Sequence, residues 1–159
     1  MVGTPHMVVG AAIGKELRRP WLALPAAFAS HFVLDRIPHL DWHGLFGIAG
    51  KGPTTPEAVF GVVDFLAGIA LVTWAVGRQP GRKLMLWCAF LALLTDLMNH
   101  VPPLRGWFVT CPWTIPFADF HGACQWNISP AWWPIGFGTQ IVVVALALWA
   151  IRRNPRRDP

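Results

Sequence analysis

Histidine and aspartate side chains recur inside the apolar segments of this sequence at spacings that suit metal binding. His31 and Asp35 are four residues apart in one segment, and Asp96 and His100 are four apart in another. Residues at i and i+4 lie on one face of a helix, and two such ligands can bind the same ion. Because imidazole and carboxylate together suit Zn, Mn or Fe(II), the sequence predicts a divalent-metal site, with zinc as the first candidate and Mn or Fe as alternatives.

Three further residues fall near these pairs. His6 opens the first apolar segment, Asp64 is the only charged residue of a third, and His39 directly follows a proline that ends the segment of His31. Along ideal helices, His31, Asp64 and Asp96 lie about 9–13 Å from one predicted end of their segments. Ionisable side chains in a bilayer are costly and by default mark functional sites. We therefore predict a cavity open at that end, with the two pairs as metal ligands, His6 at its rim, and Asp64 and His39 in catalysis.

The segments that carry these residues indicate an integral membrane protein. Hydrophobic residues make up 54% of the 159 residues and charged residues only 13%, whereas a soluble domain has about 25% charged residues. A bilayer pass needs about 20 apolar residues, so the chain has room for about four or five. The ten tryptophans fit the same interpretation, because tryptophan is enriched at membrane interfaces.

The predicted fold is an all-α polytopic bundle of four full spans and one short N-terminal half-membrane helix. The short helix, Pro5–Leu17, is about 20 Å long and cannot cross a hydrocarbon core of about 30 Å. Its Gly10 and Gly14 allow close helix approach, and Thr55 is the predicted N-cap of the third helix. The spans are predicted at Trp21–Ile37, Ala58–Gly77, Leu84–Val101 and Ala131–Ile151, with loops over 39–54 and 103–130. Residues 1–151 form one domain, and 152–159 form a disordered basic cytoplasmic tail.

Basic residues indicate the orientation of the bundle. The formal net charge is +5, but the basic residues flank apolar runs, which is typical of membrane-protein loops and not of a nucleic-acid-binding face. The expected partner is therefore the lipid bilayer and not a nucleic acid. Residues 15–19, 78–83 and 152–157 contain ten Lys and Arg, and the rest of the chain contains three. The positive-inside rule then predicts an outer N-terminus and a cytoplasmic C-terminus.

Two cysteines, Cys111 and Cys124, fall in the same predicted outer loop. We expect them to form a disulfide, which would stabilise the fold by about 3 kcal/mol on the chain-entropy model. The alternative is that both stay reduced and, with His121 between them, complete a small metal site.

Several stretches of the chain resemble a family of small bacterial membrane proteins. They comprise residues 5–14, residues 30–41, residues 95–100, and His121 with the Gln125–Trp126 pair. The family is similar to inner-membrane metal-dependent hydrolases related to zinc-dependent phospholipase C. The resemblance implies a bacterial inner-membrane location and metal binding by His6, His31, Asp35, Asp96 and His121. The sequence departs from those hydrolases in lacking their Pro-Asp-x-Asp-His element, and in having Gly122 and not serine after His121.

The leading functional hypothesis is an inner-membrane hydrolase whose metal activates water against a lipid or lipid-linked phosphate ester. Three alternatives stay open. The His/Asp set is structural, in a non-catalytic membrane subunit or scaffold; it binds haem or a pigment through His31 and His100; or it carries ions or protons along a row of polar side chains.

Overall fold

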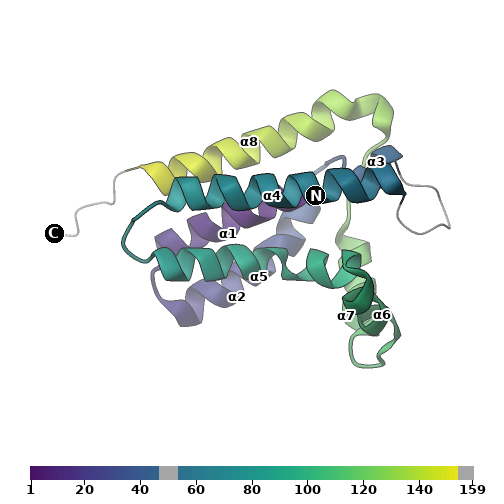
Figure 1. The fold of residues 1–159 in the computed structure, drawn as a ribbon, viewed down its shortest axis with the longest axis horizontal. Helices are drawn as coiled ribbons and strands as arrows, with labels where there is room; N and C mark the ends of the chain where they lie inside the picture. The colour runs from purple at the N-terminus through teal and green to yellow at the C-terminus, as the bar shows by residue number, and fades with distance from the viewer. Residues whose placement is uncertain (47–53, 154–159) are drawn as a thin grey trace.

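The fold is helical throughout the part of the chain that the structure, a computed structural model, describes: residues 1–46 and 54–153. The elements are α1 (Gly3–Leu17), α2 (Pro20–Asp35), α3 (Trp42–Phe46), α4 (Thr55–Val76), α5 (Arg82–His100), α6 (Pro102–Thr110), α7 (Ile115–Cys124), the 3-10 helix η1 (Pro130–Trp132) and α8 (Trp133–Arg152). Helices α1, α2, α4, α5 and α8 form a bundle, and α6 and α7 project from one of its ends (Figure 1). The predicted all-α class is confirmed.

The short helix α1 lies at the centre of the bundle, in contact with α2, α4, α5 and α8. A Cβ atom on Gly10 would lie 2.5 Å from the carbonyl oxygen of Cys88, and one on Gly14 would lie 2.8 Å from the Cα of Met85. Only glycine therefore allows α1 to lie so close to α5, which confirms the interpretation of this pair. A helix too short to cross a bilayer is here surrounded by other helices.

The N-terminus of α1 is capped by a side chain from another helix. Val2 occupies the N-cap position and makes no side-chain hydrogen bond there. Instead, the carboxylate of Asp64 on α4 accepts hydrogen bonds from the amides of Gly3 at 2.6 Å and Thr4 at 3.3 Å. A carboxylate satisfies the unpaired N–H groups of a helix start and is favoured by the helix dipole. This contact fixes the position of α1 along the bundle, and with it the position of His6.

Two helical stretches are long and apolar enough to cross a membrane: α4, with 22 residues, and Pro130–Arg152, with 23. Helices α5 and α6 together would make a third, but they meet at an angle of 83°. Helix α2 has only 16 residues, because it begins at Pro20 and ends at Asp35, ahead of Pro38. The sequence predicted four spans, whereas the described residues contain two clear candidates, or three if α5 and α6 together count as one bent span.

Some predicted boundaries need correction. Helix α4 begins after Thr54, not after Thr55, because the side chains of Thr54 and Glu57 form a reciprocal capping box. The predicted loop 103–130 contains α6 and α7, and α3 falls within the predicted loop 39–54. Residues 47–53, and residues 154–159 of the predicted tail, lie outside the described part of the chain.

The predicted disulfide is not formed: Cys88, Cys111 and Cys124 are free thiols. The carbonyl oxygen of Cys111 accepts hydrogen bonds from the amides of Thr114 and Ile115, so Cys111 lies beside the start of α7, whereas Cys124 is its last residue. Ten residues of helix extend about 14 Å, twice the roughly 7 Å that a disulfide allows between Cα atoms. Helix α7 therefore holds the two thiols apart.

The predicted basic segments meet at one end of the bundle. The Nζ of Lys15 donates to the carbonyl oxygens of Ala150, Ile151 and Arg153, where α8 ends. The guanidinium of Arg152 lies 4.3 Å from the ring centre of Trp74, near the end of α4. The C-terminal ends of α1, α4 and α8 thus lie together, at the end of the bundle away from α6 and α7 (Figure 1).

Candidate metal centre

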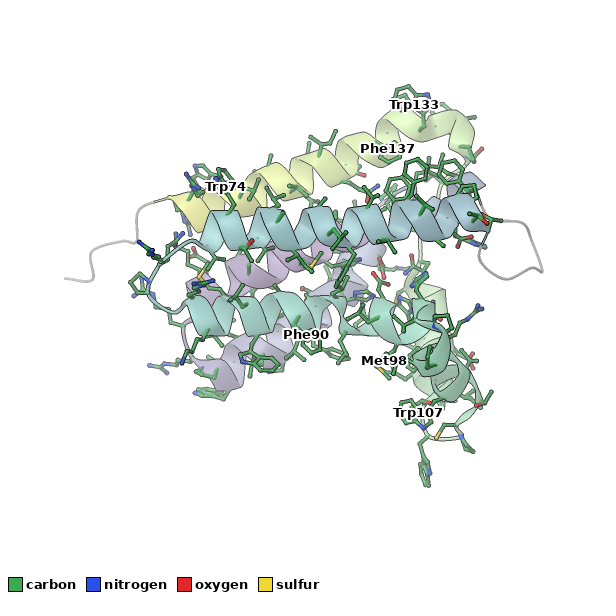
Figure 2. All side chains as sticks on the ribbon, in the orientation of Figure 1. Trp74, Phe90, Met98, Trp107, Trp133 and Phe137 are labelled. Carbon is green, nitrogen blue, oxygen red and sulfur yellow. The ribbon has the colours of Figure 1, made fainter. Side chains whose placement is uncertain are left out.

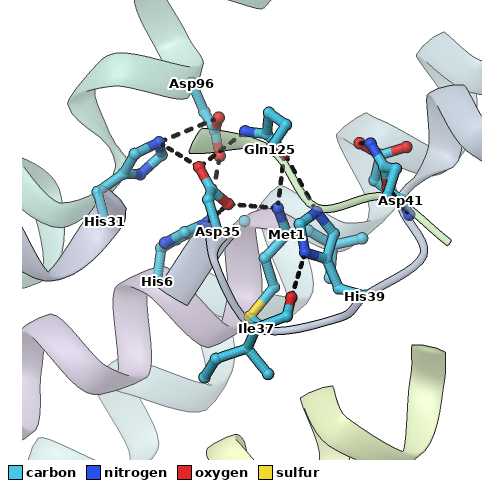
Figure 3. A network of polar contacts seen from close by, with 12 residues as sticks. Met1, His6, His31, Asp35, Ile37, His39, Asp41, Asp96 and Gln125 are labelled. Carbon is cyan, nitrogen blue, oxygen red and sulfur yellow. Dashed lines mark hydrogen bonds and ion pairs between the residues drawn. The ribbon is translucent and has the colours of Figure 1, made fainter. Parts of the chain in front are cut away.

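Five ionisable side chains from four helices converge beside the N-terminal part of α1, and four of them are labelled in Figure 3. The five side chains form two groups that share His31: His6, His31 and Asp96 in one, and His31, Asp35 and His121 in the other. Within each group, the possible ligand atoms all lie within 4.8 Å of one another. We call the five together the His/Asp cluster: His6 of α1, His31 and Asp35 of α2, Asp96 of α5 and His121 of α7. Asp96 is the most exposed member, with 14% of its side chain accessible, and the others are buried. The cluster is therefore enclosed and is not the open cavity expected from the sequence.

Two carboxylates lie among the three imidazoles of the cluster. The Nε2 atom of His31 is 3.2 Å from Oδ2 of Asp35 and 3.6 Å from Oδ1 of Asp96. The Nε2 atom of His6 is 3.2 Å from Oδ1 of Asp35 and 3.9 Å from Oδ2 of Asp96. Nε2 of His121 lies 3.5 Å from Asp35 and 3.6 Å from Asp96. Each carboxylate thus contacts all three histidines.

The Nε2 atoms of two histidines, His31 and His121, face each other in the cluster. The Nδ1 atom of His31 lies 2.8 Å from the carbonyl oxygen of Ala92, which can only accept, so Nδ1 carries the proton of the neutral ring. The Nε2 atom of His121 accepts from the side-chain amide of Gln125 at 3.0 Å. The Nε2 atom of His31 therefore directs its lone pair into the cluster and lies 3.1 Å from Nε2 of His121, whose own lone pair accepts from Gln125. Two metal–nitrogen bonds of about 2.0–2.1 Å at a tetrahedral angle would separate the nitrogens by about 3.3 Å.

The third histidine is buried and unsatisfied. The side chain of His6 is fully buried, and neither ring nitrogen makes a hydrogen bond to the described residues: Nε2 contacts Asp35 only as an ion pair at 3.2 Å. Its ring stacks on that of His31, with the ring centres 4.1 Å apart. Buried polar atoms without a hydrogen bond are uncommon in folded proteins, and such atoms often bind a water molecule or an ion. The three imidazoles and two carboxylates therefore fit a divalent cation.

Gln125 and His39 surround the cluster on the side of the loop that follows α7. The Nε2 atom of Gln125 donates to Asp35 at 2.7 Å, and its Oε1 lies 3.1 Å from Nε2 of His39. The Nδ1 atom of His39 lies 2.8 Å from the carbonyl oxygen of Ile37, and the amino group of Met1 contacts both Asp35 and Gln125 (Figure 3). Gln125 thus orients a carboxylate and an imidazole at once.

Three residues expected at the site lie outside the cluster. Asp64 caps α1, as described above. His100 follows Asp96 by one turn, but its ring is exposed and its Nδ1 donates to the backbone carbonyl of Asp96, so it does not face the other histidines. His39 reaches the cluster only through Gln125. The catalytic roles assigned to Asp64 and His39 stay predictions.

The residue that sequence reasoning missed is Gln125, which entered only through the family resemblance. Its signal was its position four residues after His121, the same spacing that identified the pair of His31 and Asp35. His6, expected at the rim, is instead buried at the centre.

The fold and the site together define an all-helical protein with candidate membrane spans and a buried His/Asp cluster able to hold a metal. No protein-family model, curated protein or solved structure matches the chain. The function is therefore inferred from the chemistry of the cluster.

Proposed function

We propose that this protein is a membrane-embedded, metal-dependent hydrolase that acts on the phosphate ester of a lipid or lipid-linked substrate. The observation that carries the proposal is the pair of Nε2 atoms of His31 and His121, which lie 3.1 Å apart, each within 3.6 Å of both carboxylates of the cluster. A cation between them would accept one lone pair from each nitrogen, and His121 would give up its hydrogen bond from Gln125. Zinc is the first candidate, and Mn or Fe(II) would accept the same donors.

The number of ions follows from the tautomer of His31. Both groups of possible ligands include His31, and its Nδ1 is occupied by the carbonyl oxygen of Ala92. Only Nε2 is free, and one imidazole nitrogen binds one ion. We therefore propose a single cation, with His31 and His121 as its first ligands and with His6, Asp35 and Asp96 completing the coordination.

The chemistry of such a site suits hydrolysis. A divalent cation would supply a nucleophile from water at neutral pH and polarise a phosphoryl oxygen. Of the cluster residues, Asp96 is the one with partial exposure, so a substrate would approach along its edge. The carboxylate of Asp96 is also placed to accept a proton from attacking water. Gln125 would hold Asp35 in position through its hydrogen bond of 2.7 Å, as residues around metal ligands commonly do.

The lipid character of the substrate is supported by the surroundings of the cluster. The two candidate spans, α4 and α8, expose apolar side chains along much of their length, among them Val63, Leu66, Ile141 and Val142. A site enclosed among such helices would receive its substrate from the bilayer more readily than from water. A bacterial inner membrane is the location that the resemblance implies.

The first test measures the metal content of the protein purified in detergent. We expect about one equivalent of metal in the wild type and a loss of at least tenfold in His31→Ala and in Asp96→Ala. His100→Ala is the matched control, because His100 lies one turn from Asp96 but its ring is exposed and directed to its own helix. Equal metal content in all four proteins would refute the metal site.

The second test measures hydrolysis in vesicles that contain phosphatidic acid, phosphatidylethanolamine and phosphatidylglycerol, followed by ³¹P NMR. We expect new phosphorus signals with the metal-loaded wild type and with His100→Ala, and none with Asp35→Asn. Metal binding without turnover would leave a metal site but remove the hydrolase function. If no metal binds either, the cluster is a structural network of ion pairs, as in the scaffold alternative.

The haem alternative has less support. It requires His31 and His100 to act as axial ligands, but Nε2 of His31 is 3.1 Å from His121 and the His100 ring lies exposed beside its own helix. A visible absorption spectrum of the purified protein distinguishes this alternative from the proposed metal site.

A further inference from the structure

The ten tryptophans separate into two sets at the two ends of the bundle. One set lies at the end that carries the basic segments, where α2 and α5 begin and α4 and α8 end; it comprises Trp21, Trp74, Trp87 and Trp149. The other set lies at the opposite end, in α3, α6, η1, the start of α8 and the loops beside α7; it comprises Trp42, Trp107, Trp113, Trp126, Trp132 and Trp133. Figure 2 shows Trp74 at one end, and Trp107 and Trp133 at the other.

Nine of these side chains are more than half exposed, and only Trp42 is partly buried. Trp133 and Trp149 belong to one helix and are sixteen residues apart, or about 24 Å along its axis. That separation is close to the thickness of a hydrocarbon core of about 30 Å. Exposed tryptophan at both boundaries of such a layer is the pattern of an aromatic belt.

The segment from α6 to α7, residues 102–124, has the geometry of an element in the plane of the membrane. Helix α6 leaves α5 at 83°, so if α5 follows the bundle axis across the bilayer, α6 runs parallel to the surface. We call this segment the α6–α7 hairpin. It projects sideways from the bundle (Figure 1), as expected of an element that spreads over one leaflet.

The outer surface of the hairpin is apolar and aromatic. Trp113, at the turn between the two helices, is 90% exposed, and Leu104, Trp107, Ile115 and Phe120 are also exposed. The charged side chains of this segment are Arg105 and Asp119. Several large apolar side chains exposed on one short segment suggest an interaction site, and tryptophan with few charges suits the boundary between headgroups and acyl chains.

The inner surface of the hairpin is packed on the bundle. Phe117 stacks on Phe28 of α2 with ring centres 5.7 Å apart, and it contacts Phe32 and the buried Phe108. His121 enters the His/Asp cluster from the same helix. The orientation of the hairpin is therefore fixed by these contacts, and its exposed aromatic surface cannot turn inward.

We infer that the α6–α7 hairpin lies in the phospholipid headgroup layer of one leaflet, with Trp113 at the boundary between headgroups and acyl chains. The partner of this surface is the lipid itself. The inference depends on the two tryptophan sets and on the bend at α6, and it holds whether or not the cluster binds metal or hydrolyses a substrate.

The test uses the full chain, labelled with 5-fluorotryptophan and reconstituted into vesicles of phosphatidylcholine and phosphatidylglycerol. Trp113→Phe identifies the ¹⁹F signal of Trp113 by its loss. Spin labels are then added at carbon 5 or at carbon 16 of the lipid chains, or as a water-soluble gadolinium chelate. We expect the carbon-5 label to remove most of the Trp113 signal, and the other two labels to leave most of it.

A control variant shows how the three labels act on a tryptophan at the bilayer centre. Leu66 is exposed in the middle of α4, so Leu66→Trp should introduce a signal that the carbon-16 label removes. If the gadolinium chelate removes the Trp113 signal and the lipid labels do not, the hairpin lies in water and the inference is wrong. It is also wrong if carbon 16 is the most effective label, or if no label acts because a second copy of the chain covers the hairpin.

Discussion

The side chain of His31 determines what the cluster can bind. Its four-residue spacing from Asp35 was readable in the sequence, because that spacing alone puts two ligands on one helix face. The contribution of His121 was not readable in this way. Its partners are His31, Asp35 and Asp96, which come from other helices, so no local spacing could identify it. The direction of the His31 proton depends on the Ala92 carbonyl of α5, which is also a tertiary contact.

The same limit explains why His100, the second member of the other pair, lies outside the cluster. Asp96 and His100 have the spacing of His31 and Asp35, but His100 is the last residue of α5 and its ring is exposed. Spacing predicts that two side chains share a face and does not predict whether that face is buried at both residues.

Replacement of Gln125 tests how the ligands are held. Gln125→Ala removes the hydrogen bond that orients Asp35, so we expect metal affinity to fall by about 10–100-fold while the protein still folds. Titration of the metal-free protein measures the effect. Gln79→Ala is the matched control, because Gln79 bonds only to the end of α4. An affinity equal to that of the wild type would show that Gln125 does not position the ligands.

Replacement of Asp64 tests its role as the cap of α1. Asp64→Ala leaves the amides of Gly3 and Thr4 without their acceptor, and loss of a helix cap costs about 0.5–2 kcal/mol. At roughly 2–4 °C per kcal/mol for a chain of this size, we expect a thermal midpoint in detergent lower by a few degrees. Asp119→Ala, which removes an exposed carboxylate from α7, should leave the midpoint unchanged. A catalytic Asp64 would instead lower activity without lowering stability.

The long helices were largely predictable from the sequence, and the short ones were not. The apolar runs of α4, α5 and α8 and the turn residues between them fix these elements within a few residues. Helices α6 and α7 were predicted as loop because the segment is rich in proline. In the structure Pro102, Pro103 and Pro116 occupy the first turns of these helices, where proline costs no hydrogen bond. Proline therefore marked helix starts in this segment.

The contact between α1 and α5 can be tested at one glycine. In Gly10→Ala the new methyl group would lie 2.5 Å from the Cys88 oxygen, and overpacking of this kind costs about 1–3 kcal/mol. Gly61→Ala is the control, because nothing lies within 4 Å of its position on α4 and alanine favours helix by up to about 1 kcal/mol. We expect Gly10→Ala to lower the thermal midpoint and Gly61→Ala to leave it equal or higher. Equal behaviour of the two variants would contradict the close packing of α1 on α5.

At the scale of the whole molecule, the basic residues and the tryptophans both define an axis along the bundle, from the end with the basic segments to the end with α6 and α7. The contacts of Lys15 and Arg152 gather the basic segments at one end, while Arg36 and Arg105 belong to the segments near the opposite end. The sequence predicted this asymmetry because short basic loops can be counted without a structure. It overestimated the number of full spans, since the length of α2 and the bend after α5 depend on how the helices pack.

The orientation of this axis can be tested with reporters fused to the C-terminus. The positive-inside rule predicts that this end stays in the cytoplasm. In a bacterial host we expect a fused green fluorescent protein to be fluorescent and a fused alkaline phosphatase to be inactive. The phosphatase fused within the turn at Trp113 should be active. The reverse pattern at both positions would invert the predicted orientation.

The central place of α1 has a consequence for the order of assembly. The ribosome makes α1 before the four helices that surround it, and most of its contacts are with α4, α5 and α8. During synthesis it has neither the length to cross a bilayer nor the neighbours to cover its polar end. Its docking must therefore be a late step, completed only after α8 has been made. Because that step brings His6 to the cluster and the N-terminus of α1 to Asp64, an incompletely assembled chain would have no complete site.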